Sequence, residues 1–166
     1  MDFRYVPPDL RKLDALSAEV ACCSIWEDEW PMLGLAGLVD WRLAGRLSHL
    51  AKGGFLTGAK DEVVMMPARP GLPFEKLIVL GLGKKSAFED AVVTRAAKRL
   101  LETLEGLQVR KAVVELPGRA DRSIPAERAA QLVRAAVGES DVHDAWWLVE
   151  DADGEKAIVG SETRRA

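Results

Sequence analysis

The feature that most constrains this sequence is the run KLIVLGL at residues 76–82, which is almost entirely apolar. A strand that is apolar on both faces is typical of a sheet covered by helices on both sides. Other strand-like runs alternate along the chain with stripes of apolar residues at helical spacing. This alternation predicts an α/β domain of three layers, in which helices flank a central sheet.

The expected strands are 19–26, 62–66, 76–82, 112–116, 145–150 and 156–159, and the expected helices are 33–51, 86–104 and 124–137. The last two strands flank Asp153-Gly154, and Asp-Gly between apolar runs is a hairpin signal. We therefore expect a C-terminal hairpin and, because a hairpin is antiparallel, a mixed sheet. Ser86 and Glu89 have the spacing of a capping box at the start of a helix.

The length of 166 residues fits a single domain over 1–166 with its core at about 15–160. The net charge of −3 offers no electrostatic attraction for nucleic acid or an anionic membrane. No apolar stretch is long enough for a membrane span, and the N-terminus lacks the pattern of a signal peptide. The adjacent Cys22 and Cys23 are expected on opposite faces of a strand, reduced and buried, in a cytoplasmic protein.

A glycine-rich turn follows the 76–82 strand and precedes a helix. Gly81, Gly83, Lys84, Lys85 and Ser86 form this turn. Free N–H groups at a helix start, with two lysines beside them, favour an anion such as phosphate. The spacing fits neither a P-loop nor a dinucleotide-binding fingerprint. Two interpretations remain open, an anion-binding loop and a sharp structural corner that needs glycines for close packing.

No catalytic or metal-binding constellation can be recognised. His49 and His143 lie far apart, and no Ser-His-Asp or Cys-His arrangement connects the candidate nucleophiles. The three carboxylates at 27–29 have the pattern of a solvated turn after a strand. We therefore expect no catalytic residue, no metal site and no cofactor.

Aromatic residues in two segments are candidates for a protein interface. Asp40, Trp41 and Arg42 lie within the expected 33–51 helix. Trp146 and Trp147 are neighbours on an expected strand, so that one indole should fill the core and the other should face outward. These five residues are the predicted interface positions, and packing against the core is the alternative role for each tryptophan.

Several short motifs occur in the order found in one known family. They are DWRLAGRL at 40–47, GFLTG at 54–58, LIVLGLGK at 77–84 and PAERAAQLVRAAVG at 125–138. Over about residues 15–150 the chain resembles the N-terminal domain of the leucyl (cytosol) aminopeptidase family. The resemblance implies a macro-domain-like fold with a mixed sheet between helices. In that family a separate catalytic domain carries a two-metal centre in motifs such as NTDAEGR, which has no counterpart here.

The resemblance therefore implies a free-standing, non-catalytic module that binds a protein partner, associates with itself, or regulates a full aminopeptidase. The alternative is a macro-like domain that binds ADP-ribose or another nucleotide through the loop from Gly81 to Ser86. A third hypothesis, a peptidase in its own right, lacks the metal ligands that it would need.

Overall fold

The computed structural model describes residues 1–138 and 140–164. Its centre is one six-stranded sheet with the order β1-β6-β5-β2-β4-β3. Only the edge strand β3 is antiparallel to its neighbour, and the other four pairings are parallel. The strands are β1 (Asp2–Val6), β2 (Val20–Ile25), β3 (Val63–Pro67), β4 (Lys76–Gly81), β5 (Lys111–Val114) and β6 (Ala145–Val149).

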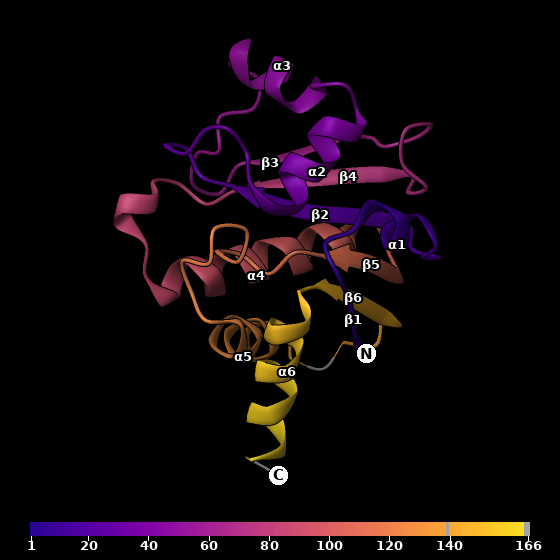
Figure 1. The fold of residues 1–166 in the computed structure, drawn as a ribbon, viewed down its shortest axis with the longest axis vertical. Coiled ribbons are helices and arrows are strands. Elements are labelled where there is room, and N and C mark those ends of the chain that lie inside the picture. Colours follow the sequence, from indigo (N-terminus) through magenta and orange to yellow (C-terminus); the bar gives the residue numbers. More distant parts are fainter. Residues whose placement is uncertain (139, 165–166) are drawn as a thin grey trace.

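Helices cover both faces of this sheet, so the predicted three-layer α/β architecture is confirmed (Figure 1). One face carries α1 (Leu10–Asp14), α2 (Gly34–Arg42) and α3 (Arg46–Lys52). The other carries α4 (Asp90–Gly106), α5 (Ala126–Val137) and α6 (Ala152–Thr163). None of the helices in the described part of the chain is both long and apolar enough to cross a bilayer.

The central strand β2 divides the core into two halves. Cys22 packs with the α4–α5 side, and Cys23 packs with the α2 side. Both thiols are free and buried, as the sequence predicts, and burial raises the pKa of each. A buried neutral thiol behaves as a small apolar side chain. The two cysteines therefore fill the core and are not a redox pair.

The predicted C-terminal hairpin is wrong. Residues 156–159 belong to helix α6, which begins after Asp151. The Asp151 carboxylate accepts a hydrogen bond from the Gly154 N–H at 2.7 Å, so it caps a helix and does not begin a turn. The sheet is mixed, as expected, but its antiparallel pair is β3 with β4.

The predicted helix over 33–51 is two helices in the structure. Ala44 and Gly45 have φ values of 55° and 80°, and this left-handed segment ends α2 and starts α3. The predicted capping box is also absent. Residues Lys85–Ala87 form a short 3-10 turn, η1, and α4 begins only at Asp90, where Glu89 provides no side-chain cap. The N-terminal strand β1 was not predicted.

Candidate functional site

The carboxyl ends of the parallel strands meet at one edge of the sheet. The chain leaves β2 through α2 on one face, toward β3 and β4. After β4 the chain passes through α4 on the opposite face of the sheet and enters β5. Strand β5 pairs with β2 on the side away from β4, so the direction of strand addition reverses at β2. In open α/β sheets, ligands bind in the crevice where the strand order reverses in this way. The crevice between the ends of β2 and β5 is therefore the first place to look for a ligand site.

A carboxyl group of the chain itself occupies this crevice. Glu115 follows β5 directly and is only 5% exposed. Its Oε2 accepts a hydrogen bond from the Leu35 N–H, in the first turn of α2, at 2.6 Å. A Cβ atom on Gly34 would lie 2.3 Å from the same oxygen, so only glycine leaves room for it. Glu115 therefore fills the position at the start of α2 that an external anion could otherwise take.

Burial sets the charge state of Glu115. The pKa of this carboxyl is raised to about 8, chiefly because burial removes the group from water. The hydrogen bond from Leu35 opposes this rise, and the nearby carboxylates of Glu150 and Asp121 contribute to it. Oε1 of Glu115 has no hydrogen-bond partner among the described residues. At neutral pH this group is consequently largely protonated, and it can donate as well as accept a hydrogen bond.

An ion pair closes the crevice from another side. Arg119 Nε lies 2.6 Å from Glu150 Oε1, and a second bond of 3.0 Å joins Arg119 Nη2 to Glu150 Oε2. Both side chains are largely buried. The space that remains beside Glu115, Arg119 and Glu150 is about 120 Å³. Pockets for drug-sized ligands and cofactors usually measure about 300–1,000 Å³, so this crevice is too small for a nucleotide in its present form.

The two glycines of the predicted anion loop pack against another stretch of backbone. A Cβ atom on Gly81 would lie 1.9 Å from the Ala59 carbonyl oxygen. Gly83, at a φ of 81°, donates its N–H to the Gly58 carbonyl at 2.9 Å. Both are buried. These contacts give the glycines a structural role at a sharp corner, whatever else the loop binds.

The polar groups of the same loop face carboxylates from the chain. The Lys85 N–H donates to Asp28 at 2.7 Å, which holds the pKa of that carboxyl below its usual value. Lys85 Nζ lies 2.6 Å from Asp121 and 3.2 Å from Glu29. Lys84 and Ser86 are exposed. Two of the three carboxylates at 27–29 thus bind this loop, and no metal-binding cluster occurs within residues 1–138 and 140–164.

Of the three predicted interface residues on α2, Trp41 is exposed, whereas Asp40 and Arg42 are bound to other residues of the chain. The side chain of Trp41 is 76% exposed. Arg42 forms a two-bond ion pair with Asp14, at 3.0 and 3.1 Å. Asp40 accepts hydrogen bonds from the N–H and the hydroxyl of Ser48, and these bonds join α2 to α3.

The two tryptophans of β6 differ as expected, but neither is fully exposed. Trp146 is completely buried and contacts Phe3 edge-to-face, with 6.1 Å between the ring centroids. Trp147 is half-buried, and the Arg4 guanidinium lies over its ring at 5.3 Å. Trp146 therefore belongs to the core, and Trp147 is covered in part by the N-terminal strand.

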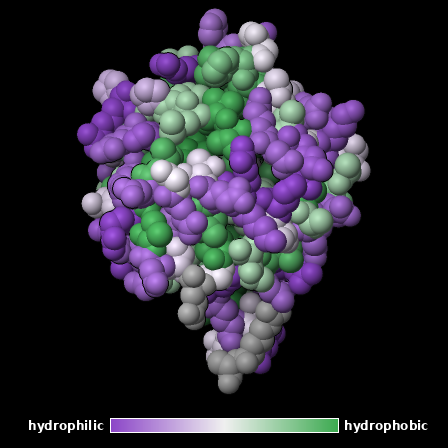
Figure 2. All heavy atoms as spheres, turned by 180° about the vertical axis from the view of Figure 1, so that it is seen from behind, coloured by the Kyte–Doolittle hydropathy of each residue, from purple (hydrophilic) through white to green (hydrophobic). Residues whose placement is uncertain are grey.

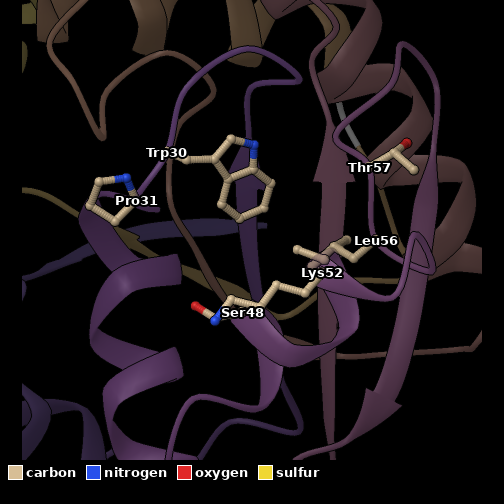
Figure 3. A pocket seen from close by; sticks show the side chains of 7 residues that line it. Trp30, Pro31, Ser48, Lys52, Leu56 and Thr57 are labelled. Carbon is tan, nitrogen blue, oxygen red and sulfur yellow. The ribbon is translucent and has the colours of Figure 1, made fainter.

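The sequence analysis missed Trp30 and Phe55, which are 45% and 65% exposed. Trp30 lines a hollow of about 570 Å³ together with Pro31, Ser48, Lys52, Leu56 and Thr57 (Figure 3). A second hollow, of about 510 Å³, lies on the Trp41 side of Pro31 and also includes Met32 and Asp40. We call these two hollows, with Trp30, Trp41 and the neighbouring Phe55, the α2–α3 surface.

Figure 2 shows hydrophobic residues gathered at the upper end of the molecule, the end at which Figure 1 places α3. A large aromatic residue in a loop rich in glycine, proline or acidic residues has few apolar neighbours in the sequence. Trp30 in WEDEWP and Phe55 in GGF share this property, and it is the signal by which they could have been found.

The family model for the N-terminal domain of the cytosol aminopeptidase family matches residues 29–144. The chain belongs to this family. The matched segment contains the whole α2–α3 surface, the glycine loop and Glu115. The match is to the N-terminal domain alone and does not include the family's catalytic domain.

Curated relatives agree with this membership. The "Probable cytosol aminopeptidase" of Pseudomonas syringae is 27% identical over 85 residues, which are 51% of this chain and 17% of the relative. The cytosol aminopeptidase of Pseudomonas aeruginosa is 29% identical over 98 residues, 59% of this chain and 20% of the relative. This cytosol aminopeptidase N-terminal domain thus matches about a fifth of the length of its curated relatives.

Solved structures show the same fold at low sequence identity. A mutant of tomato leucine aminopeptidase superposes with a TM-score of 0.67 at 14% identity, over 98% of this chain and 35% of that one. The Trypanosoma brucei macrodomain in complex with ADP-ribose gives 0.72 at 12% identity, over 96% and 68%. The macrodomain of Mycobacterium tuberculosis DarG gives 0.69 at 15%, over 90% and 99%. The expected macro-domain-like fold is therefore confirmed.

Proposed function

We propose that this protein is a non-catalytic module that binds another protein through the α2–α3 surface. The observation that carries the proposal is the 76% exposure of Trp41 beside two hollows with apolar walls. Tryptophan is enriched among residues that dominate binding energy at interfaces. Hollows flanked by exposed aromatic side chains are typical of sites that receive a partner's side chains.

The partner classes that this role implies are a second copy of the chain and a separate protein, which includes a full-length aminopeptidase of the same family. Either partner would cover the apolar walls of the α2–α3 surface and gain free energy by removing them from water. The module would then act by assembly or by regulating its partner, without chemistry of its own.

Affinity purification with matched variants tests this role. The tagged wild-type chain, a Trp41→Ala/Phe55→Ala variant and a Val159→Ala variant are expressed in their native cells, and the co-purifying proteins are quantified by mass spectrometry. Val159 is an exposed apolar residue on α6, away from the proposed surface, and serves as the control. We expect a stoichiometric partner with the wild type and the control and its loss from the double variant. Equal recovery with all three would contradict the proposal.

A nucleotide-like ligand at the sheet edge is the second candidate. It is supported by the position of the crevice at the reversal of strand order. A structural neighbour, the Trypanosoma brucei macrodomain, is in complex with ADP-ribose. The small volume of the crevice argues against a nucleotide there, and the Glu115 side chain already occupies the start of α2 that an anion would need.

Calorimetric titration with ADP-ribose distinguishes the two candidates. On the leading proposal, the folded wild-type protein gives no binding heat and no change in melting temperature at millimolar ligand. Saturable binding that a bulky substitution of Gly83 weakens would instead favour the loop from Gly81 to Ser86 as a phosphate site.

A further inference from the structure

Strand β3 forms one edge of the six-stranded sheet (Figure 1). Its hydrogen bonds to β4 fall on even-numbered residues, since the Glu62 carbonyl accepts from the Gly81 N–H and the Ala68 N–H donates to the Glu75 carbonyl. Antiparallel strands exchange hydrogen bonds at alternate residues. The backbone groups of the odd-numbered residues of β3 therefore point away from β4, toward the outside of the sheet.

The outer side of β3 consists of the N–H and carbonyl groups of Val63 and Met65 and the carbonyl of Pro67, which has no N–H. In the described part of the chain, no other backbone group bonds to them. Among the described elements, β4 alone packs closely along β3. Unpaired N–H and carbonyl groups on an edge strand are a template for pairing with another strand.

The side chains of β3 also leave this edge unprotected. Its sequence, VVMMP, carries no charge. The strand at the opposite edge, β1, carries Asp2 and Arg4, and both are exposed. Charged side chains on an edge strand oppose its pairing with another chain, and a proline removes a single donor. Strand β1 is protected in the first way, whereas β3 has only Pro67 at its end. The β3 edge is therefore the one that suits pairing.

We propose that β3 pairs with β3 of a second copy of this chain, antiparallel and centred on Met65, so that the two sheets become continuous. In this register Met65 faces Met65 of the second copy, and Val63 faces Pro67. The Val63 N–H donates to the Pro67 carbonyl, and the missing N–H of Pro67 falls at the end of the ladder. The inference goes beyond the proposed function, because it concerns a different surface from the one that carries Trp41.

The side chains that this pairing covers are apolar. Val63 packs in part against the core under α4, and side chains two apart along a strand share a face. Met65 and Pro67 therefore lie on the same face, and both are exposed. Contact between the two Met65 side chains, and between Val63 and Pro67, removes this apolar surface from water.

The charges at the two ends of β3 suit an antiparallel copy of the same strand. Glu62, just before β3, is bound by neutral groups only. Arg69, just after its end, has no ion-pair partner in the described residues. In the proposed register each Glu62 comes near Arg69 of the other copy, so opposite charges meet at both ends. Of the neighbouring charges, Asp61 is paired with Arg95, Lys76 is paired with Glu75, and Lys60 lies against Gly83 beyond the end of β4.

Sedimentation of the full chain, from micromolar to millimolar concentration, tests the pairing. Met65→Lys places two like charges face to face at the centre of the ladder. Val159→Lys, at an exposed position on α6, is the control with the same change in charge. Both positions are exposed, so the fold should be retained, and circular dichroism checks this. We expect the wild type and the control to dimerise, and Met65→Lys to raise the dissociation constant of the dimer at least about tenfold.

Cysteine crosslinking tests the register. Two facing residues that exchange hydrogen bonds have Cα atoms about 5.5 Å apart, which is within reach of a disulfide. Met65→Cys should therefore link two chains under mild oxidation. Pro67→Cys, on the same face, should not, because each Pro67 faces Val63 and lies about 13 Å from the other Pro67.

A wild-type chain that stays monomeric at millimolar concentration would overturn the inference, and so would a dimer that Met65→Lys leaves unchanged. Equal crosslinking from the two cysteines would exclude the register and overturn it as well. A dimer abolished by Trp41→Ala but not by Met65→Lys would assign self-association to the α2–α3 surface. The inference would then fail while the proposed function would stand. Dimerisation through β3 without any partner captured at Trp41 would support the inference and contradict the proposed function.

Discussion

The Glu115 carboxyl group accepts a hydrogen bond from the Leu35 N–H at 2.6 Å and so connects the end of β5 to the first turn of α2. The two residues are 80 positions apart in the sequence. Because this bond occupies a helix N-terminus at the reversal of strand order, the place best suited to an external anion is used by the protein itself. The exposed aromatic residues of the α2–α3 surface then become the main binding candidates.

The raised pKa of Glu115 predicts a pH-dependent stability. The folded protein keeps this proton up to about pH 8, whereas the unfolded chain releases it near the ordinary value of 4.5. Between these values the folded state binds more protons, so the free energy of unfolding falls as pH rises. One such group gives a slope of at most about 1.4 kcal/mol per pH unit, and the loss should level off above about pH 8.

Urea denaturation of the wild type and Glu115→Gln at several pH values measures this effect. The glutamine keeps a neutral side chain at all pH values, and the other titrating groups are the same in both proteins. The difference in unfolding free energy between the two should therefore change steadily from about pH 5 to about pH 8. Parallel curves for the two proteins would show that Glu115 titrates normally.

The buried ion pair of Arg119 with Glu150 should contribute far more to stability than an exposed pair on the same loop. Arg119→Met leaves the Glu150 carboxylate buried without its partner, and we expect a loss of about 3–5 kcal/mol. Arg122→Met breaks the exposed pair with Asp151 and should cost less than about 1 kcal/mol. Thermal unfolding of both variants provides the comparison, and similar losses would refute the argument from burial.

Substitution of Gly81 tests whether the glycine loop is a packed corner. Gly81→Ala places a methyl group against the Ala59 carbonyl, and we expect a destabilisation of about 1–3 kcal/mol or more. Gly106→Ala is the control, because no atom lies within 4 Å of the added methyl at the end of α4. This control should be stabilised by about 0.5–1 kcal/mol. A Gly81→Ala protein as stable as the wild type would show that the corner can relax.

Asp40 should stabilise the junction between α2 and α3. Asp40→Ala removes the acceptor for both the Ser48 N–H and its hydroxyl, and we expect a loss of about 1–2 kcal/mol. Ser48→Ala keeps the bond to the backbone N–H and should cost less. Chemical denaturation ranks the two variants. A larger loss for Ser48→Ala would mean that the hydroxyl, and not the helix start, is the group that matters.

The central strands of the sheet could be predicted because each is a nearly continuous run of apolar residues. All of the residues of β2 are buried, as are all but the first of β4, and both strands read as apolar runs. The edge strand β1, with its alternating exposed and half-buried residues, has no such run and was missed. In α6 only Gly154 and Ile158 are buried, so its sequence shows no clear apolar stripe, and its Asp-Gly pair suggested a turn.

The site depended on contacts that a sequence does not display. Nothing near Glu115 in the chain indicates that its carboxyl group reaches Leu35, because the fold alone brings the two together. Trp41 was among the predicted interface residues because it is an aromatic residue within the expected 33–51 helix. Trp30 was not, because its exposure depends on how the loop after β2 packs against α3.

The most direct test of the account is photo-crosslinking in native cells with benzoylphenylalanine in place of Trp41, compared with the same probe in place of Val159. Both positions are exposed, and only the first lies on the α2–α3 surface. The account predicts a discrete protein adduct from position 41 and none from position 159. Equal adducts from both positions, or none from position 41 while the protein is folded, would contradict the claim that this surface binds a partner.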